Sequence, residues 1–489
     1  MKAEGLSLLS ILLLVTMASC KLNRKPGDLT LKPYLFQTAE GEKIDAELGT
    51  LIVPENRHNT KSELIKLAFV RLRSIAKNPG PPIVFLAGGP GQPGIEQAKA
   101  ARSPVILALR EVGDVIALDQ RGTGLSERNL KCKQRLDYPL NHPANRQDLV
   151  AAWKQQAQEC ASYWKDKGVD LSAYNTNESA DDVDALRQAL GAERISLLAH
   201  SYGTTLAIAV LRRHGEHIQK VIMSGMEAPD QTYKLPSNAQ RQLEIIAQLC
   251  RSDPTLSQNI PDLVGLLKTV SDHLKNQPVI VVVVDPDTQS KTMVTVSDFD
   301  LRLMTAAYIG RETEIKAFPA MLYSMSLGDF SSLAKWALDY RHQQMSAMPF
   351  AMDCASGVSR ERWTRIEREE SGTFLGRDLD FPFPEICAAW GVSELDSTFR
   401  SDLNSDVPAL FVSGTIDGRT PISNAEEVRK GFRNSTLVII NGAAHSQSLF
   451  VGSPRIKDLM LEFMKGSAVS TSRITVTPIE FDPPNPSAP

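Results

Sequence analysis

Short runs dominated by apolar residues recur along this chain, and they limit its possible folds more than any other feature. They cover residues 82–86, 114–118, 194–198, 220–223, 409–412 and 437–440. A run that is apolar at successive positions suits a strand buried on both faces, as in a parallel sheet. Between two of them, the stretch 179–190 has apolar residues at helical spacing, with Ser179 placed to cap it and Gly191 to end it. Strands that alternate with helices predict an α/β fold, in which helices flank a mostly parallel central sheet.

The stretch from residue 229 to 400 breaks this alternation. It is mainly helical in pattern, with one strand pair indicated at 279–284 and 293–296. An insertion of this size between two core strands is expected to form a cap over the sheet edge where active sites form. Short strands are also expected near the N-terminus, at 46–54 and 64–73, and one more within 473–481. The predicted division is a leader at 1–19, a first core part at 20–228, the cap at 229–400, a second core part at 401–466, and a C-terminal strand with a Pro-rich tail at 467–489.

The first twenty residues have the pattern of an export signal. Lys2 precedes an apolar run over 6–17, which is too short to span a bilayer because spanning takes about 20 residues. The run is followed by Ala18-Ser19-Cys20, which resembles the lipobox of bacterial lipoproteins, where the cysteine carries the lipid. The alternative is plain secretion, with Cys20 as a bystander. We therefore expect a protein of the periplasm or cell envelope that is anchored to a bacterial membrane through a lipid on Cys20.

Composition indicates a folded globular protein, with 42% hydrophobic and 23% charged residues. Lys and Arg total 54 against 57 Asp and Glu, a net charge of -3, so no nucleic-acid partner is expected. Export permits disulfides. Setting Cys20 and Cys250 aside, four cysteines can pair in three ways, and pairing sequence neighbours is the simplest choice: Cys132 with Cys160, and Cys354 with Cys387. Cys250 is then a buried free thiol, and because no pair has CxxC spacing, no metal site is expected.

Residues 195–205 combine a buried strand, a sharp turn and the start of a helix. Their sequence, ISLLAHSYGTT, matches the nucleophile-elbow pattern except that Ala199 replaces the first glycine. The tight turn requires small residues two places before and after the nucleophile, and Ala199 and Gly203 satisfy this. Ser201 is therefore the expected nucleophile, and the N-terminus of the following helix favours negative charge there. His200 is an unsuitable base because it is the immediate neighbour of Ser201.

A glycine-rich loop, residues 87–94, follows another predicted strand. A phosphate-binding loop is disfavoured because Pro90 and Pro93 lack N–H donors and no Gly-Lys-Ser/Thr sequence follows. The sequence favours an oxyanion loop, in which the backbone N–H of Gly89 acts with that of Tyr202 on a tetrahedral intermediate.

Two further residues complete a catalytic constellation. Asp417 follows the apolar run at 409–412, and His445 follows the run at 437–440. The chain order Ser201, Asp417, His445 is that of α/β-hydrolases. In such a triad His445 would deprotonate Ser201, and Asp417 would orient the imidazole and stabilise its charged form.

Two glycine motifs carry a resemblance to a known family. Gly88-Gly89-Pro90-Gly91 and the turn over 119–126, DQRGTGLS, resemble the prolyl iminopeptidase branch of the α/β-hydrolases. The long exported form, with its bulky cap and paired cap cysteines, is similar to secreted tripeptidyl aminopeptidases over most of 45–480. Ala87 stands where this loop usually has His, and Ala199 where the elbow usually has Gly. The resemblance implies that Asp119 and Arg121 are structural and hold the glycine loop in place.

The resemblance also implies an activity: a serine hydrolase, without a cofactor, that cleaves peptide bonds near the N-terminus of peptides. Such an enzyme must recognise a free ammonium group, and Glu227, Glu312 and Glu314 are the candidate carboxylates, although most such glutamates simply face solvent. One alternative is a carboxylesterase that acts on small esters. Another is a binding lipoprotein without catalytic activity.

Overall fold

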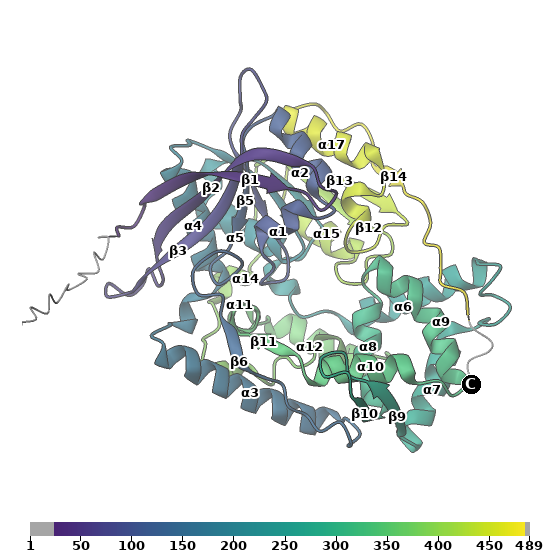
Figure 1. Cartoon of the computed structure of the whole chain (residues 1–489). Coiled ribbons are helices and arrows are strands. Elements are labelled where there is room, and N and C mark those ends of the chain that lie inside the picture. Colours follow the sequence, from purple (N-terminus) through teal and green to yellow (C-terminus); the bar gives the residue numbers. More distant parts are fainter. Residues whose placement is uncertain (1–23, 485–489) are drawn as a thin grey trace, which may run out of the picture.

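A ten-stranded sheet forms the upper part of the molecule in Figure 1, a computed structural model that describes residues 24–484. The strand order is β1-β2-β3-β5-β4-β7-β8-β12-β13-β14. The strands are β1 (Leu29–Gln37), β2 (Lys43–Pro54), β3 (Leu64–Leu72), β4 (Ile83–Leu86), β5 (Val115–Asp119), β7 (Ile195–His200), β8 (Ile218–Ser224), β12 (Ala409–Gly414), β13 (Ser435–Asn441) and β14 (Arg473–Thr475). β1, β2, β3 and β5 pair antiparallel, and every pairing from β5 to β14 is parallel.

Helices cover both faces of this sheet. One face packs against α4 (Thr176–Ala189), α5 (Tyr202–His214) and α15 (Ile422–Arg429). The other packs against α1 (Gly94–Lys99), α2 (Ser103–Ala108), α16 (Ser448–Val451) and α17 (Pro454–Lys465). Every residue of β4, β5, β7 and β12 is buried, which explains why these strands are apolar at nearly all positions. The predicted α/β class is confirmed.

The segment after β8 forms a second, mainly helical layer, which lies below the sheet in Figure 1. Its helices are α6 (Pro236–Ser252), α7 (Leu263–Asn276), α8 (Asp298–Tyr308), α9 (Glu312–Ser326), α10 (Ser331–Arg341), α11 (Ala347–Ser356), α12 (Arg360–Glu370), α13 (Cys387–Trp390) and α14 (Ser397–Arg400). The expected strand pair is present as the antiparallel hairpin of β9 (Val279–Val284) and β10 (Lys291–Val296).

An earlier part of the chain also joins this helical layer. β6 (Lys131–Arg135) pairs antiparallel with β11 (Gln344–Ser346), and α3 (Arg146–Asp166) packs against α13. The predicted division instead assigns β6 and α3 to the first core part. Their sequence alone could not indicate that β6 pairs with a strand more than 200 residues later. Two disulfides stabilise this region: Cys132–Cys160 links β6 to α3, and Cys354–Cys387 links α11 to α13. Both expected pairings are confirmed, and Cys250 is a buried free thiol.

The two ends of the chain differ from the expected elements in detail. β2 begins at Lys43, earlier than the predicted start at residue 46, because its first residues pair with β1. β14 covers three residues of the expected 473–481 strand, and the chain from there to residue 484 has no regular structure. The predicted leader and Cys20 lie outside the described residues. Between residues 24 and 484, no helix has the length and apolar character needed to cross a membrane.

Candidate active site

Ser201 occupies the sharp turn between β7 and α5, with backbone angles φ 55° and ψ -131°. A positive φ is costly for any residue with a side chain, so the surrounding contacts must hold this conformation. The space around the turn is small. A Cβ atom on Gly203 would lie 2.1 Å from the carbonyl oxygen of Leu86, and one on Gly88 would lie 2.9 Å from Cβ of Ser201. The spacing of small residues in the sequence therefore reflects direct contact between this turn and the end of β4.

The structure brings the three predicted catalytic residues together in one hydrogen-bonded chain. Nε2 of His445 lies 2.9 Å from Oγ of Ser201, and Nδ1 of His445 lies 2.9 Å from Oδ2 of Asp417. All three residues are buried. They meet because β7, β8, β12 and β13 are consecutive parallel strands, whose carboxyl ends lie along one edge of the sheet.

Thr420 is a further member of this hydrogen-bonded chain that sequence reasoning missed. Its hydroxyl donates to Oδ2 of Asp417 at 2.7 Å and lies 3.0 Å from Nδ1 of His445. Asp417 also accepts the backbone N–H groups of Arg419 and Thr420, at 2.9 and 2.8 Å. A threonine three residues after an aspartate is a common turn arrangement, so the sequence gave no reason to single it out.

His200 lies close to the site but has a different environment. Its ring centre is 5.1 Å from that of His445, and its Nδ1 lies 3.2 Å from the carbonyl oxygen of Ser224. Burial, with the nearby Arg102, holds the pKa of His200 well below its usual range. It is therefore neutral at ordinary pH, and its ring packs against Phe450 as part of the wall behind His445.

The predicted oxyanion residues flank Ser201. Gly89, with φ 119°, lines the same cavity as Ser201, in a conformation that favours glycine. Tyr202 is the first residue of α5, so its backbone N–H has no acceptor within the helix. The Tyr202 side chain is buried, and its hydroxyl lies 2.9 Å from Oγ1 of Thr176, so it points away from the reacting group.

The turn after β5 contacts the glycine-rich loop directly. A carboxylate oxygen of Asp119 accepts the N–H of Ile95 at 2.9 Å, and the Gln120 side chain donates to the carbonyl oxygen of Ala87 at 3.3 Å. Arg121 is completely buried and makes two 2.8 Å contacts with the carboxylate of Asp182. The contacts of Asp119 and Gln120 hold the loop at its two ends. Contrary to expectation, Arg121 does not contact the loop, because its guanidinium is buried against Asp182 on α4.

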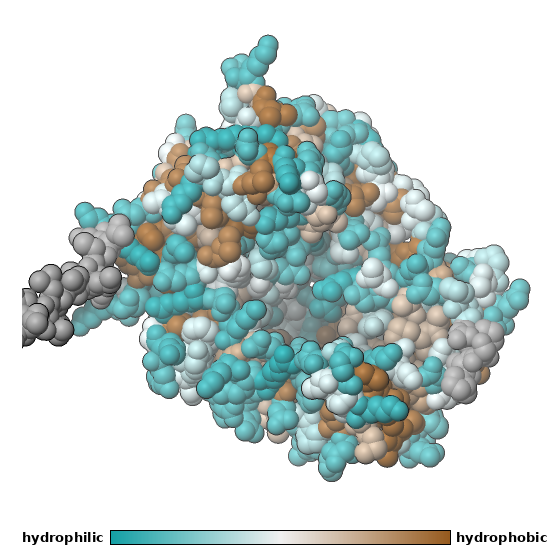
Figure 2. Space-filling model, viewed as in Figure 1, coloured by the Kyte–Doolittle hydropathy of each residue, from teal (hydrophilic) through white to brown (hydrophobic). Residues whose placement is uncertain are grey.

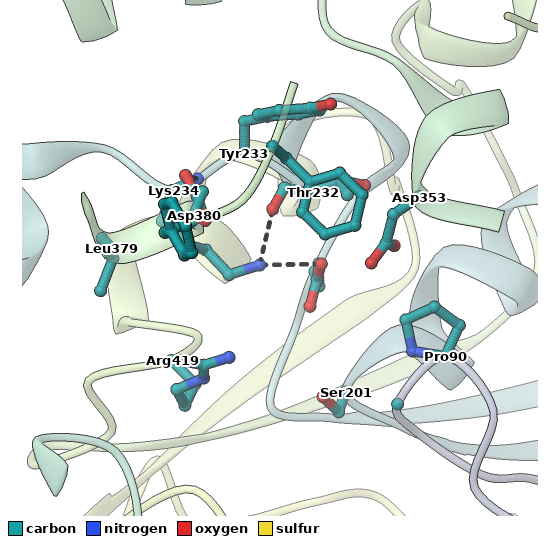
Figure 3. Close-up of a pocket in the computed structure, with 13 residues that line it drawn as sticks. Pro90, Ser201, Thr232, Tyr233, Lys234, Asp353, Leu379, Asp380 and Arg419 are labelled. Carbon is teal, nitrogen blue, oxygen red and sulfur yellow. Dashed lines mark hydrogen bonds and ion pairs between the residues drawn. The ribbon is translucent and has the colours of Figure 1, made fainter. Parts of the chain in front are cut away.

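A cavity of about 150 Å³ opens beside Ser201 and is rich in charge (Figure 3). Its charged lining residues are Glu227, Lys234, Asp353, Asp380 and Arg419. Nζ of Lys234 lies 2.8 Å from Oε1 of Glu227 and donates to the carbonyl oxygens of Gln231 and Thr232. The backbone N–H of Lys234 donates to Asp380 at 2.6 Å. Burial raises the pKa of Asp380 to about 6, against the favourable charge of Lys234.

Asp353 differs from the other carboxylates of the cavity. Its side chain, on α11, makes no hydrogen bond or ion pair with any residue between 24 and 484, and Figure 3 shows it directed into the cavity. Burial and the neighbouring charge of Glu227 raise its pKa well above the usual range. A cation that entered the cavity would offset the cost of burying the Asp353 carboxylate and its repulsion by Glu227, so Asp353 is suited to bind a cation.

The other two predicted glutamates lie elsewhere. Glu312 and Glu314 begin α9, and neither lines the cavity beside Ser201. A carboxylate oxygen of Glu314 lies 3.6 Å from the guanidinium of Arg311, three residues earlier in the chain. Of the three candidates for ammonium recognition, the structure brings Glu227 alone to the cavity. The sequence could not indicate Asp353 or Asp380, because only the packing of the helical layer turns them toward Ser201.

Two protein families match separate parts of this chain, and individual relatives match longer stretches. Residues 81–256 match the family of the alpha/beta hydrolase fold, and residues 380–472 match the family described as TAP-like protein. The chain is 25% identical over 416 residues to the putative hydrolase YuaR of Escherichia coli, which covers 79% of this chain and 78% of that protein. It is 21% identical over 478 residues to a tripeptidyl aminopeptidase of Streptomyces coelicolor, covering 88% and 83%. The serine protease Hip1 of Mycobacterium tuberculosis is 27% identical over 188 residues, covering 37% of this chain and 36% of Hip1.

Proposed function

Because the chain belongs to the α/β-hydrolase peptidase family that includes the tripeptidyl aminopeptidases, we propose that it is a serine exopeptidase that cleaves peptide bonds near a free N-terminus. One observation carries the proposal. The two 2.9 Å contacts that join Ser201, His445 and Asp417 end at a cavity whose wall holds a carboxylate, Asp353, that has no partner among residues 24–484.

The chemistry proposed for the triad follows from these contacts. Oγ of Ser201 attacks the peptide carbonyl while Nε2 of His445 accepts its proton, and Asp417 stabilises the imidazolium that forms. The N–H groups of Gly89 and Tyr202 stabilise the oxyanion. His445 then gives the proton to the leaving amine, an acyl-enzyme remains on Ser201, and a water molecule activated by His445 releases the acyl group.

Recognition of the amino terminus is assigned to Asp353, with Glu227 beside it. Lys234 already balances the charge of Glu227 through their 2.8 Å contact, whereas Asp353 has no protein partner among residues 24–484. An ammonium group in the cavity would donate a charge-assisted hydrogen bond to Asp353, and its charge would lower the energetic cost of burying this carboxylate. A peptide whose N-terminus is acylated lacks that interaction.

We further propose that the protein is exported. Disulfides persist mainly in oxidising compartments, and the structure holds two. Lipid attachment at Cys20 stays a prediction from the leader sequence.

The test compares three substrates with purified enzyme: a short peptide anilide with a free N-terminus, its N-acetylated twin, and a short-chain aryl ester. We expect acetylation to lower kcat/KM by about tenfold or more, because it removes the charge that Asp353 binds. The Ser201→Ala variant should cleave none of the three. Ester cleavage with neither anilide hydrolysed would instead establish a carboxylesterase. Absence of Ser201-dependent labelling by a fluorophosphonate would indicate a binding lipoprotein without catalytic activity.

A further inference from the structure

The cavity beside Ser201 also holds a guanidinium group, that of Arg419, which the proposed reaction does not use. Within the described part of the chain, this guanidinium makes no hydrogen bond or ion pair, and Arg419 takes part through its backbone N–H alone, which donates to Asp417. The other cation of the cavity, Lys234, is already engaged with Glu227 and two carbonyl oxygens. Arg419 therefore presents its donors to the cavity.

The position of Arg419 is fixed close to the reacting groups. It follows Asp417 by two residues on the loop after β12, and its aliphatic part passes directly over Gly310. A Cβ atom at Gly310 would lie 2.6 Å from Cγ and Cδ of Arg419, so a larger residue there would displace the side chain. The carbonyl oxygen of Gly310 in turn accepts the backbone N–H of His445 at 3.1 Å.

Arg419 and the unpaired carboxylate lie on either side of Ser201 in Figure 3, with Arg419 on the left and Asp353 on the right. Burial raises the pKa of Asp353 and of Asp380, and the positive charge of Arg419 opposes that rise, so Arg419 acts on both carboxylates at a distance. Neither carboxylate has an oxygen within 4.0 Å, the limit for an ion pair, of the guanidinium nitrogens of Arg419. The guanidinium fork thus stays free for a ligand, and its geometry matches a carboxylate in a two-point contact.

We propose that Arg419 binds a substrate carboxylate beside the bond that is cleaved, so that the enzyme favours substrates with an acidic group at this place. The inference rests on the proposed exopeptidase function and names a specificity determinant for it. The carboxylate has two possible sources: an acidic side chain on the residue whose carbonyl is attacked, or the terminal carboxylate of a short leaving part. Both present the same chemistry to the guanidinium.

Two matched substrate pairs distinguish the sources, and all four compounds have a free N-terminus. The first pair carries Glu or Gln immediately before an anilide. In the second pair a single residue follows the cleaved bond, and its C-terminus is either a free carboxylate or a carboxamide. The rate of fluorophosphonate labelling of Ser201 in the presence of each compound measures its binding independently of turnover.

In the wild type we expect one pair to show about a tenfold or larger preference for the carboxylate, in kcat/KM and in protection from labelling. Arg419→Met should abolish this preference, and Arg419→Lys should retain part of it, because a lysine keeps the charge without the fork. Arg311→Met is the matched control. It removes the same charge from a nearby arginine that does not line the cavity, and it should leave the preference unchanged.

Three results would overturn the inference: no preference in either pair, a preference that survives in Arg419→Met, or an equal loss in Arg311→Met. An equal fall for acidic and neutral compounds in Arg419→Met would mean that this residue merely balances the cavity carboxylates. The proposed function fails separately, if a neutral anilide with a free N-terminus is cleaved no faster than its N-acetylated twin. Thermal unfolding of each variant identifies any loss of folded protein.

Discussion

Replacing Asp353 by Asn separates the substrate-binding role of this carboxylate from its cost to the folded protein. The side chain lies in the cavity without a protein partner among residues 24–484, and burial together with Glu227 raises its pKa. Asn is nearly the same size and keeps one oxygen acceptor, so Asp353→Asn removes the charge with little change in packing. We expect the variant to lose affinity for the substrate ammonium group while its folded state becomes more stable.

The size of the activity loss follows from the contact that is removed. Two unit charges 4 Å apart at an effective dielectric constant of 20 attract by about 4 kcal/mol, which is an upper bound because both groups also leave water. A hydrogen bond to a charged group contributes about 1.5–3 kcal/mol net, equivalent to a fall in kcat/KM of roughly 10- to 150-fold. The fall applies only to substrates with a free amine.

The assay is a cycle of two enzymes and two substrates. kcat/KM is measured for wild type and Asp353→Asn, each with a free and an N-acetylated peptide anilide. The expected result is a large loss with the free amine and almost none with the acetylated twin. Equal losses with both substrates would refute the assignment, because Asp353 would then act on the shape of the site and not on the ammonium group.

The stability effect has a definite sign. A carboxyl group whose pKa is raised in the folded state holds its proton more tightly there than in the unfolded chain. Its contribution to the free energy of unfolding therefore declines as pH rises from the usual aspartate value, 3.8, towards the raised value of Asp353. Asp353→Asn avoids this decline, so its midpoint of thermal unfolding at neutral pH should exceed that of the wild type. In the wild type, cleavage of free-amine substrates should increase as Asp353 ionises, in addition to any increase that both enzymes share because His445 must lose its proton.

Three further predictions concern residues around the site. Arg121→Met removes two hydrogen bonds from the buried carboxylate of Asp182. It should lower the free energy of unfolding, measured by denaturant titration, by about 3–5 kcal/mol. A change within about 0.5 kcal/mol, the usual range for surface substitutions, would contradict a stabilising role of the buried ion pair. Thr420→Val removes one hydrogen bond to Asp417 and should lower kcat by about tenfold, with fluorophosphonate labelling slowed but still present. Burial raises the pKa of the Cys250 thiol to about 12, so iodoacetamide should fail to modify it at pH 8 until the protein is unfolded.

Local sequence was sufficient to predict the elements that carry the triad. The apolar runs at 194–198, 409–412 and 437–440 are strands in the structure, and the residue types after each run are those that the chemistry needs. Parallel strands bring their carboxyl ends to one edge, so chain order and strand pattern together indicated that Ser201 and His445 would meet. The disulfide pairs were equally predictable, because each joins cysteines that are close in sequence.

The substrate cavity was not predictable in the same way. Glu227 follows a core strand directly, and for that reason the sequence indicated it, whereas Glu312 and Glu314 share its residue type but lie away from the cavity. Asp353 and Arg419 come from elements 66 residues apart, on α11 and on the loop after β12. No periodic pattern relates the two positions.

The sequence by itself therefore determined the fold class, the order of the strands along the chain and which three residues form the hydrogen-bonded chain of Ser201, His445 and Asp417. These depend on the alternation of apolar and polar residues and on short motifs, which act within a few residues. Tertiary structure alone decided that Asp353 and Arg419 line the cavity beside Ser201, and that their side chains have no partner among residues 24–484. Helices of the second layer pack against one another through nonspecific apolar contacts, so the direction in which Asp353 points depends on the packing of the whole layer.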